Sequence, residues 1–185
     1  MSGGKHAVRY VALLRGINVG QGARVPMADL KSLLQGLGVS DVVTYLNSGN
    51  AVFSSELGVA DLTPLLEGGF HRTFGARIPT LVKTSEEIVS IARAIPREWG
   101  SGEGEQTYVA YLFSDVDEPG LVAELPVKLE FLSIFYTPGA IVWNIKRENY
   151  NRSHITKIAG HSSYARMTTR NVNTARKLAE LCADT

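Results

Sequence analysis

The sequence of 185 residues lacks the features that mark several large classes of protein. Its single cysteine, Cys182, excludes an intramolecular disulfide and any zinc site built from several cysteines. No run approaches the roughly 18 uncharged apolar residues of a membrane span, and residues 1–6 lack the apolar core of a signal peptide. We therefore expect a cytoplasmic protein without a membrane partner.

A strong net charge is also absent. The formal net charge is +1, which provides little overall attraction to nucleic acids or membranes. This total hides a contrast, because residues 101–140 carry a net charge of −6 and residues 141–185 a net charge of +5. With 44% hydrophobic and 20% charged residues, the composition is that of an ordinary folded protein.

The first half of the chain predicts the order βαββαβ followed by a helix. Apolar runs favour strands, and apolar residues repeated every three or four positions favour helices. Thr84 and Glu87 also form a capping box that opens the last helix of this half. The expected elements are strand 6–14, helix 26–37, strands 41–47 and 50–55 around a Ser48-Gly49 turn, helix 61–74, edge strand 77–83 and helix 84–95.

The second half repeats this order after the Gly-rich linker 100–105. Its expected elements are strand 107–113, helix 118–125, strands 129–136 and 140–146, helix 153–160, strand 164–169 and helix 171–182. The sequence therefore predicts an α+β fold with two ferredoxin-like subdomains, residues 1–100 and 101–185, each ending in an extra helix. The repeated order suggests an internal duplication, although the residues themselves do not repeat.

Four segments resemble a known family: LLRGINVG (13–20), VPM (25–27), YLNSGNAVF (45–53) and TTRN followed by NT (168–171, 173–174). With these motifs the chain is identified as a member of the bacterial domain-of-unknown-function family 1697. The resemblance implies two α+β subdomains of ferredoxin-like type. It implies no established activity, substrate or cofactor.

The loop RGINVGQGAR (15–24) is the first candidate site. In the predicted topology it shares a sheet edge with the turn between the second and third strands. Glycines let backbone N–H groups approach a ligand, and arginines donate paired hydrogen bonds to phosphate or carboxylate. The candidate ligand-binding residues are Arg15, Gly16, Asn18, Gly20, Arg24, Asn47, Ser48 and Asn50.

A purely structural role is open for the same residues, since Gly and Asn are also what a tight loop and a hairpin turn require. The loop lacks the Gly-Lys-Ser/Thr ending of a phosphate-binding P-loop, and GxGxxG is absent. Open-sheet RNA binding is disfavoured, because both faces of strand 6–14 are largely apolar and its neighbour 50–55 offers only Phe53 as an aromatic.

The basic final quarter is the second candidate site. Its cations interleave with Trp143, Tyr150 and Tyr164, a mixture suited to phosphates and stacked bases. The alternative is a set of solvated faces and ion pairs with the acidic stretch. The candidate residues are Lys146, Arg147, Arg152, Lys157, Arg170 and Asn171, with Arg166, Arg176 and Lys177 in the same stretch.

The segment TTRN has two interpretations. In the first, Thr169 or Asn171 caps the last helix while Arg170 stays free to meet an anion. In the second, the segment serves only to cap that helix.

Groups suited to catalysis are scarce. The four histidines, His6, His71, His154 and His161, are scattered, so no metal site is expected. Cys182 lies on an apolar helix face, where burial is expected.

Three functions therefore stay open. The first is binding of an anionic small molecule or a nucleic-acid backbone through loop 15–25 and the basic quarter. The second is an enzyme with a cleft between the two halves, in which Arg15 holds substrate and Asn18 or Ser48 is a polar catalytic group. The third is a homodimer formed through exposed strand edges.

Overall fold

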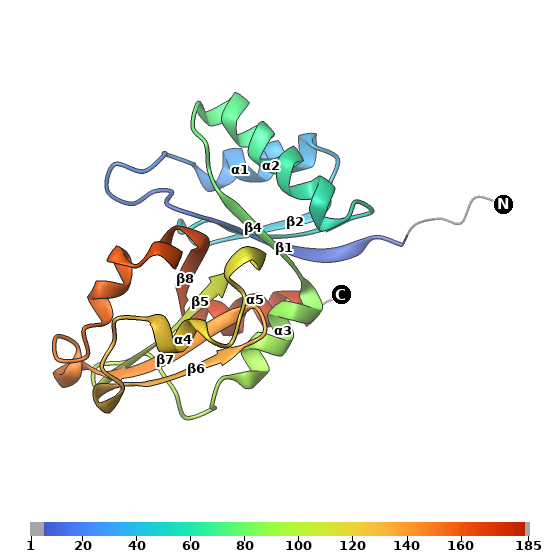
Figure 1. The fold of residues 1–185 in the computed structure, drawn as a ribbon. Coiled ribbons are helices and arrows are strands. Elements are labelled where there is room, and N and C mark those ends of the chain that lie inside the picture. Colours follow the sequence, from blue (N-terminus) through green and yellow to red (C-terminus); the bar gives the residue numbers. More distant parts are fainter. Residues whose placement is uncertain (1–5, 184–185) are drawn as a thin grey trace. The chain divides into compact units, whose positions relative to one another are not determined.

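The computed structural model describes residues 6–183, which form two antiparallel sheets of four strands each (Figure 1). The chain divides into two compact units. Unit 1 comprises Met1–Ile88 together with Leu181–Thr185, and unit 2 comprises Val89–Glu180. The division lies inside helix α3 (Ser85–Ala94), ahead of the Gly-rich segment at which the sequence suggests a boundary.

Apart from one helix of unit 2, each unit contains the elements that its hydrophobic pattern predicts, with some changes of length. Unit 1 contains β1 (Val8–Leu14), α1 (Met27–Gly36), β2 (Ser40–Tyr45), β3 (Asn50–Ser55), α2 (Val59–Phe74), β4 (Thr80–Thr84) and the first residues of α3. Unit 2 contains β5 (Glu105–Leu112), α4 (Leu121–Glu124), β6 (Ser133–Thr137), β7 (Ala140–Lys146), β8 (Met167–Asn171) and most of α5 (Val172–Ala183).

The two sheets have the same topology. Their strand orders are β2-β3-β1-β4 and β6-β7-β5-β8, so the first and third strands of each unit lie at the centre. All neighbouring strands are antiparallel. This is the strand order of the split βαβ fold, and the predicted α+β class with two subdomains is confirmed.

The central strand of unit 1 is buried on both faces. Tyr10, Ala12 and Leu14 belong to the core that α1 and α2 cover, while Val11 and Leu13 on the opposite face are fully buried as well. Phe53 is also fully buried. The aromatic side chains of β1 and β3, Tyr10 and Phe53, therefore pack inside the core of unit 1.

The helix α2 runs through Gly68-Gly69 without a break. A Cβ at residue 69 would lie 2.8 Å from Cδ1 of Leu37, so the glycine allows α2 to pack closely against the residue that follows α1. Glycines lower the helix propensity of this segment, and the close packing offsets that loss.

In unit 2 the segment expected to form helix 153–160 is instead a 3-10 helix at Ile155–Gly160. This prediction was wrong because the segment has only Ile155 and Ile158 to bury, a spacing of three that suits 3-10 geometry. His154 ahead of it adopts a left-handed backbone with φ of 59°, which blocks an earlier helical start. Only short turns therefore cover this part of the second sheet.

Several other elements are shorter than predicted, among them the second helix and the last strand of unit 2. The helix expected at 118–125 is confined to Leu121–Glu124, because Pro126 favours the extended backbone seen at Leu125. The strand expected at 164–169 begins only at Met167, since residues up to Arg166 form a 3-10 turn.

The turn between β2 and β3 is also longer than predicted. Tyr45 pairs directly with Asn50, so the connection is four residues, 46–49, and not the pair Ser48-Gly49. Leu46 and Gly49 both adopt positive φ within it. Of the predicted caps, the Thr84–Glu87 box is present, with Glu87 N–H donating to Thr84 Oγ1 at 3.2 Å and Thr84 N–H to Glu87 Oε2 at 2.8 Å.

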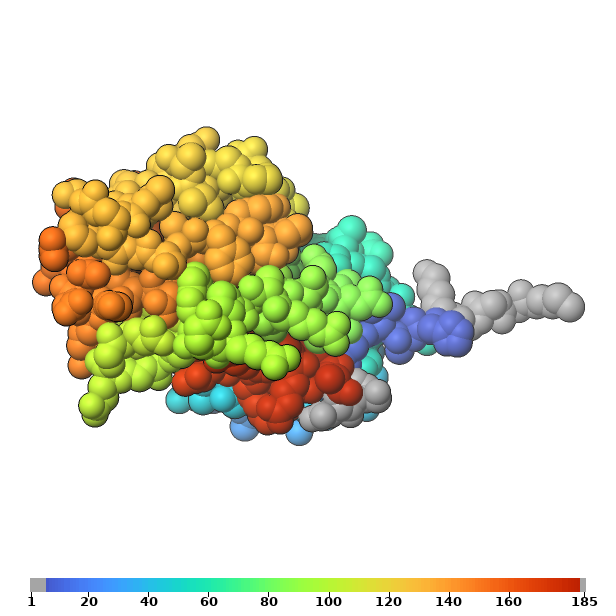
Figure 2. Space-filling model, turned by 90° about the horizontal axis from the view of Figure 1, so that it is seen from below, coloured from blue at the N-terminus to red at the C-terminus, as the bar shows by residue number. Residues whose placement is uncertain are grey.

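Asn171 caps α5, because its Oδ1 accepts a hydrogen bond from the N–H of Thr174 at 2.9 Å. Residues between α3 and β5 pack against the same helix (Figure 2), where Arg176 donates to the carbonyls of Pro96 and Trp99 at 3.0 and 2.9 Å. Within residues 6–183, no helix combines the length and apolar character needed to cross a membrane.

The substitution Gly49→Ala is expected to lower the free energy of unfolding by about 2 kcal/mol or more. A left-handed backbone costs an alanine about 1–2 kcal/mol, and the new Cβ would lie 2.8 Å from Cβ of Leu14. Gly36→Ala in α1 is the matched control, because its Cβ meets open space and alanine favours the helix by up to about 1 kcal/mol. Urea unfolding measures the free energy of unfolding of both variants. An equal change in the two would show that the positive φ of Gly49 and its contact with Leu14 do not matter for stability.

Candidate functional site

Loop 15–25 and turn 46–49 of unit 1 lie together, as the predicted topology requires. The N–H of Leu14 donates to the carbonyl of Gly49 at 2.8 Å, and Asn18 Nδ2 donates to the carbonyl of Asn47 at 2.9 Å. The sequence therefore places these two segments correctly.

The amide of Asn18 is fully used inside the protein. Nδ2 also donates to the carbonyl of Val25 at 2.8 Å, and Oδ1 accepts from the N–H of Val25 at 2.8 Å. Asn50 is likewise buried and donates to the Tyr45 carbonyl and to Ser48 Oγ. These contacts agree with the structural interpretation of the two asparagines.

The glycines of loop 15–25 have a structural reason as well. A Cβ at residue 22 would lie 2.2 Å from the carbonyl oxygen of Gly16, and both Gly16 and Gly20 adopt positive φ. The exposed Arg24 lines a shallow hollow of about 300 Å³ together with Asn18, Val25, Pro26 and Asn47. Ligand binding at this edge stays a prediction.

The substitution Asn18→Ala is expected to destabilise the protein by about 2–4 kcal/mol, because three hydrogen bonds of about 1 kcal/mol each are lost and alanine tolerates φ of 55° poorly. The exposed neighbour Arg24→Ala is the control and should change stability by less than about 0.5 kcal/mol. Chemical denaturation followed by circular dichroism gives both values. If the Asn18→Ala protein is as stable as the control, the three hydrogen bonds of the Asn18 side chain do not stabilise the fold.

Several cations of unit 2 are engaged in structural contacts. Arg166 forms a bidentate ion pair with Asp115, with its guanidinium 4.2 Å above the ring of Phe113. This pair joins the acidic and basic stretches, as one of the two interpretations predicts, and it holds the pKa of the Asp115 carboxyl below its usual range. Lys177 pairs with Glu180 at 2.6 Å.

The expectation that Arg170 stays free to meet an anion was wrong. Its side chain is buried and donates to Thr168 Oγ1 at 2.9 Å and to the Thr169 carbonyl at 3.0 Å. Burial lowers the pKa of Arg170 to about 10. Strand alternation explains the error, because Arg170 points to the buried face of β8 while the exposed Thr169 points to the other.

Other cations of this stretch remain accessible. Among residues 6–183, Lys146, Arg147, Arg152 and Lys157 are exposed and form no ion pair. The guanidinium of Arg152 lies 4.2 Å from the centre of the Phe131 ring.

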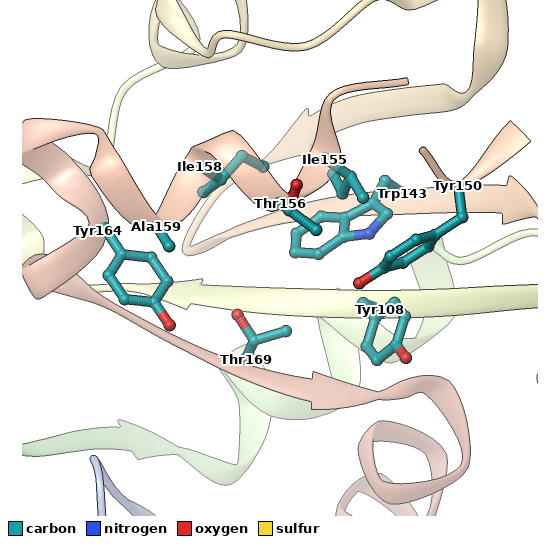
Figure 3. Close-up of a pocket in the computed structure, with 9 residues that line it drawn as sticks. All are labelled: Tyr108, Trp143, Tyr150, Ile155, Thr156, Ile158, Ala159, Tyr164 and Thr169. Atoms are coloured by element: carbon teal, nitrogen blue, oxygen red, sulfur yellow. The ribbon is translucent and has the colours of Figure 1, made fainter. Parts of the chain in front are cut away.

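An aromatic pocket of about 270 Å³ lies in unit 2 (Figure 3). It brings together the three aromatic residues that the sequence places in the basic stretch, Trp143, Tyr150 and Tyr164. Figure 3 shows Tyr164 and Thr169 at one end and Tyr108 and Tyr150 at the other, with Trp143 between them. The lining residues are Tyr108, Trp143, Tyr150, Ile155, Thr156, Ile158, Ala159, Tyr164 and Thr169.

Strand register builds the floor of the pocket. Tyr108 of β5 pairs with Trp143 of β7, so both rings stand on the same face of the sheet, 5.8 Å apart between centroids. Thr169 of β8 pairs with Ala110, two residues further along β5. The 3-10 segment that replaces the expected helix supplies the wall with Ile155, Thr156 and Ile158.

One polar atom in the pocket has no internal partner. Trp143 is only 6% exposed, and its Nε1 is buried. This nitrogen makes no hydrogen bond within the described residues. A buried donor without an acceptor costs about 1–3 kcal/mol. Figure 3 shows this nitrogen on the side of the indole that faces Tyr150.

A second hollow of about 330 Å³ adjoins the pocket and shares Tyr150 with it. Its lining is rich in hydrogen-bond donors from Gln106, Arg147 and Asn151, with Ile145 beside them. Tyr108 O–H donates to Gln106 Oε1 at 2.6 Å, which links the two hollows. Burial is the main cause that raises the pKa of Tyr108, so its hydroxyl stays neutral at physiological pH.

The lining of the two hollows is uncharged apart from Arg147. No acidic side chain lines either hollow. Desolvation first, and then the charges of Lys157 and Lys128, lower the pKa of His154 next to Ile155.

Sequence reasoning missed half of this site. Gln106 and Tyr108 lie 35 and 33 residues before the basic stretch begins at residue 141, Thr156 carries no distinctive pattern, and Thr169 is predicted only as a helix cap. The available signal was the alternation in the strand after the linker, which places Gln106 and Tyr108 on one face.

The described residues supply little for metal or thiol chemistry. Between residues 6 and 183, no three His, Cys, Asp or Glu side chains gather as metal ligands. His161 accepts a hydrogen bond from Ser163 N–H at 3.3 Å through Nδ1. Cys182 is buried, and burial raises the pKa of its thiol to about 11, so it is not a thiolate at neutral pH.

Two antiparallel sheets of matching strand order, the second carrying an aromatic pocket, define a two-unit α+β protein. The chain belongs to the family of proteins of unknown function DUF1697, which matches residues 8–143. It is similar to a solved structure, the conserved bacterial protein SP0830 from Streptococcus pneumoniae, with 26% identity and a TM-score of 0.82 over 96% of this chain and 99% of that chain. A comparison with curated proteins gives no match.

Proposed function

We propose that unit 2 binds an anionic small molecule with a planar aromatic ring. The observation that carries this proposal is the aromatic pocket formed by Tyr108, Trp143, Tyr150 and Tyr164, which shares Tyr150 with the hollow that Arg147 lines. Aromatic side chains bind planar rings by stacking, and Arg or Lys groups at the rim attract phosphate or carboxylate.

The size of the pocket limits the ligand. Binding pockets for drug-sized molecules span about 300–1,000 Å³. A volume of about 270 Å³ therefore suits one ring system, with the charged group of the ligand outside the aromatic walls.

The charge around the pocket argues against a cationic ligand. Aromatic cages also bind quaternary ammonium groups, and they do so through the negative faces of the rings. Here Arg147 lines the adjoining hollow, so a cation held there would meet like charge. An anion gains from the same arrangement.

The proposal is tested with Trp143 as an internal reporter. The protein has two tryptophans, and Trp99→Phe leaves only Trp143 while keeping a ring against Phe135. Nicotinate, benzoate and AMP are titrated in turn while emission is recorded with excitation at about 295 nm. At least one is expected to change the emission saturably, whereas benzyltrimethylammonium should not.

The variant Tyr150→Ala is expected to weaken that binding about 10-fold, within the 1–3 kcal/mol that one stacking contact contributes. Tyr45→Ala, on β2 of unit 1, is the control and should leave the affinity unchanged. If none of the three anions binds, or if only the ammonium compound does, the proposed function is wrong.

A further inference from the structure

We infer that the ligand is a nucleoside phosphate, with its base in the aromatic pocket and its phosphate in the adjoining hollow of Arg147. This inference rests on the proposed function and goes further, because it assigns each of two adjoining hollows to one part of a single ligand. Tyr150 lines both hollows and therefore marks where the two parts of the ligand join.

The polar groups of the aromatic pocket fit the edge of a base better than a plain hydrocarbon ring. The buried Nε1–H of Trp143 needs an acceptor, and the hydroxyls of Thr156 and Thr169 both donate and accept. A nucleobase carries ring nitrogens and exocyclic groups that match such a set, whereas a phenyl ring has no hydrogen-bonding group to offer them.

Tyr150 must shift for this match to form. Nε1 of Trp143 is closed to solvent on the side that faces Tyr150 (Figure 3). The Tyr150 side chain is 40% exposed, and its hydroxyl makes no hydrogen bond within residues 6–183, so rotation away from the indole breaks no internal bond. A base acceptor then takes the place that the ring vacates.

The second hollow has the donors that a phosphate needs. Arg147 is exposed and forms no ion pair within the described chain, and its backbone N–H donates to the Gly104 carbonyl at 3.0 Å, which fixes its segment to the strand region. Gln106 uses Oε1 to accept from Tyr108, which leaves its Nε2 for donation. Asn151 adds a further amide.

Isothermal titration calorimetry of AMP, adenosine and ribose 5-phosphate tests this assignment on the full chain. AMP is expected to bind at least 10-fold more tightly than adenosine, and ribose 5-phosphate should bind more weakly than AMP. Arg147→Ala should remove most of the difference between AMP and adenosine and leave adenosine binding unchanged. The control Arg152→Ala, whose guanidinium stacks on Phe131 and lines neither hollow, should leave both affinities unchanged.

The possible results distinguish a failure of the nucleoside phosphate assignment from a failure of the proposed function. If nicotinate or benzoate binds but AMP binds no better than adenosine, the nucleoside phosphate assignment is overturned and the proposed function stands. Equal effects of Arg147→Ala and Arg152→Ala also overturn it. If no planar anion binds, both fail.

A further arm distinguishes a free nucleotide from the end of a single strand, which share this chemistry. A 5′-phosphorylated tetraadenylate is titrated beside AMP at low and high salt. A free-nucleotide site gives equal or tighter binding of AMP, whereas a strand site gives tighter binding of the tetramer with a steeper loss of affinity in salt. If neither compound binds, the assignment is wrong.

Discussion

The pairing of β5 with β7 is the constraint on which the candidate site depends. Because Tyr108 lies directly opposite Trp143, two large rings stand side by side on one face of the sheet. A shift of one residue in this register would turn Tyr108 to the other face and remove the floor of the pocket. The register is maintained along the whole of β5, from Glu105 to Tyr111, so the pocket rests on the most continuous ladder of unit 2.

What covers that floor differs between the two units. In unit 1 the 16 residues of α2 pack across the sheet, and the aromatic residues beneath it, Tyr10 and Phe53, are buried. In unit 2 the corresponding connection from β7 to β8 contains only 3-10 turns, which bury Ile155 and Ile158 but leave space beside Trp143. The same strand order thus supports a closed core in one unit and a pocket in the other. A full-length helix in unit 2 would fill the site.

The fold followed from the sequence wherever local signals agreed with the tertiary structure. Apolar periodicity located α1 and α5, and the Thr84–Glu87 box marked the start of α3. The site was harder to predict, because its floor depends on a pairing between residues 35 positions apart. Arg170 shows why charge alone does not predict exposure. Its charge predicted an exposed side chain, but the alternation of β8 places it on a buried face. There Thr168 and the Thr169 carbonyl accept its hydrogen bonds.

Unit 1 is assembled from two separate stretches of chain, since Leu181–Thr185 belongs with Met1–Ile88. During synthesis on a ribosome, the first stretch emerges long before the residues around Cys182, so its final contacts form only after all of unit 2 has been translated. Unit 2 is continuous and has no such delay. Unit 1 therefore depends on both ends of the chain, and a fragment ending at Ile88 would lack part of the unit to which it belongs.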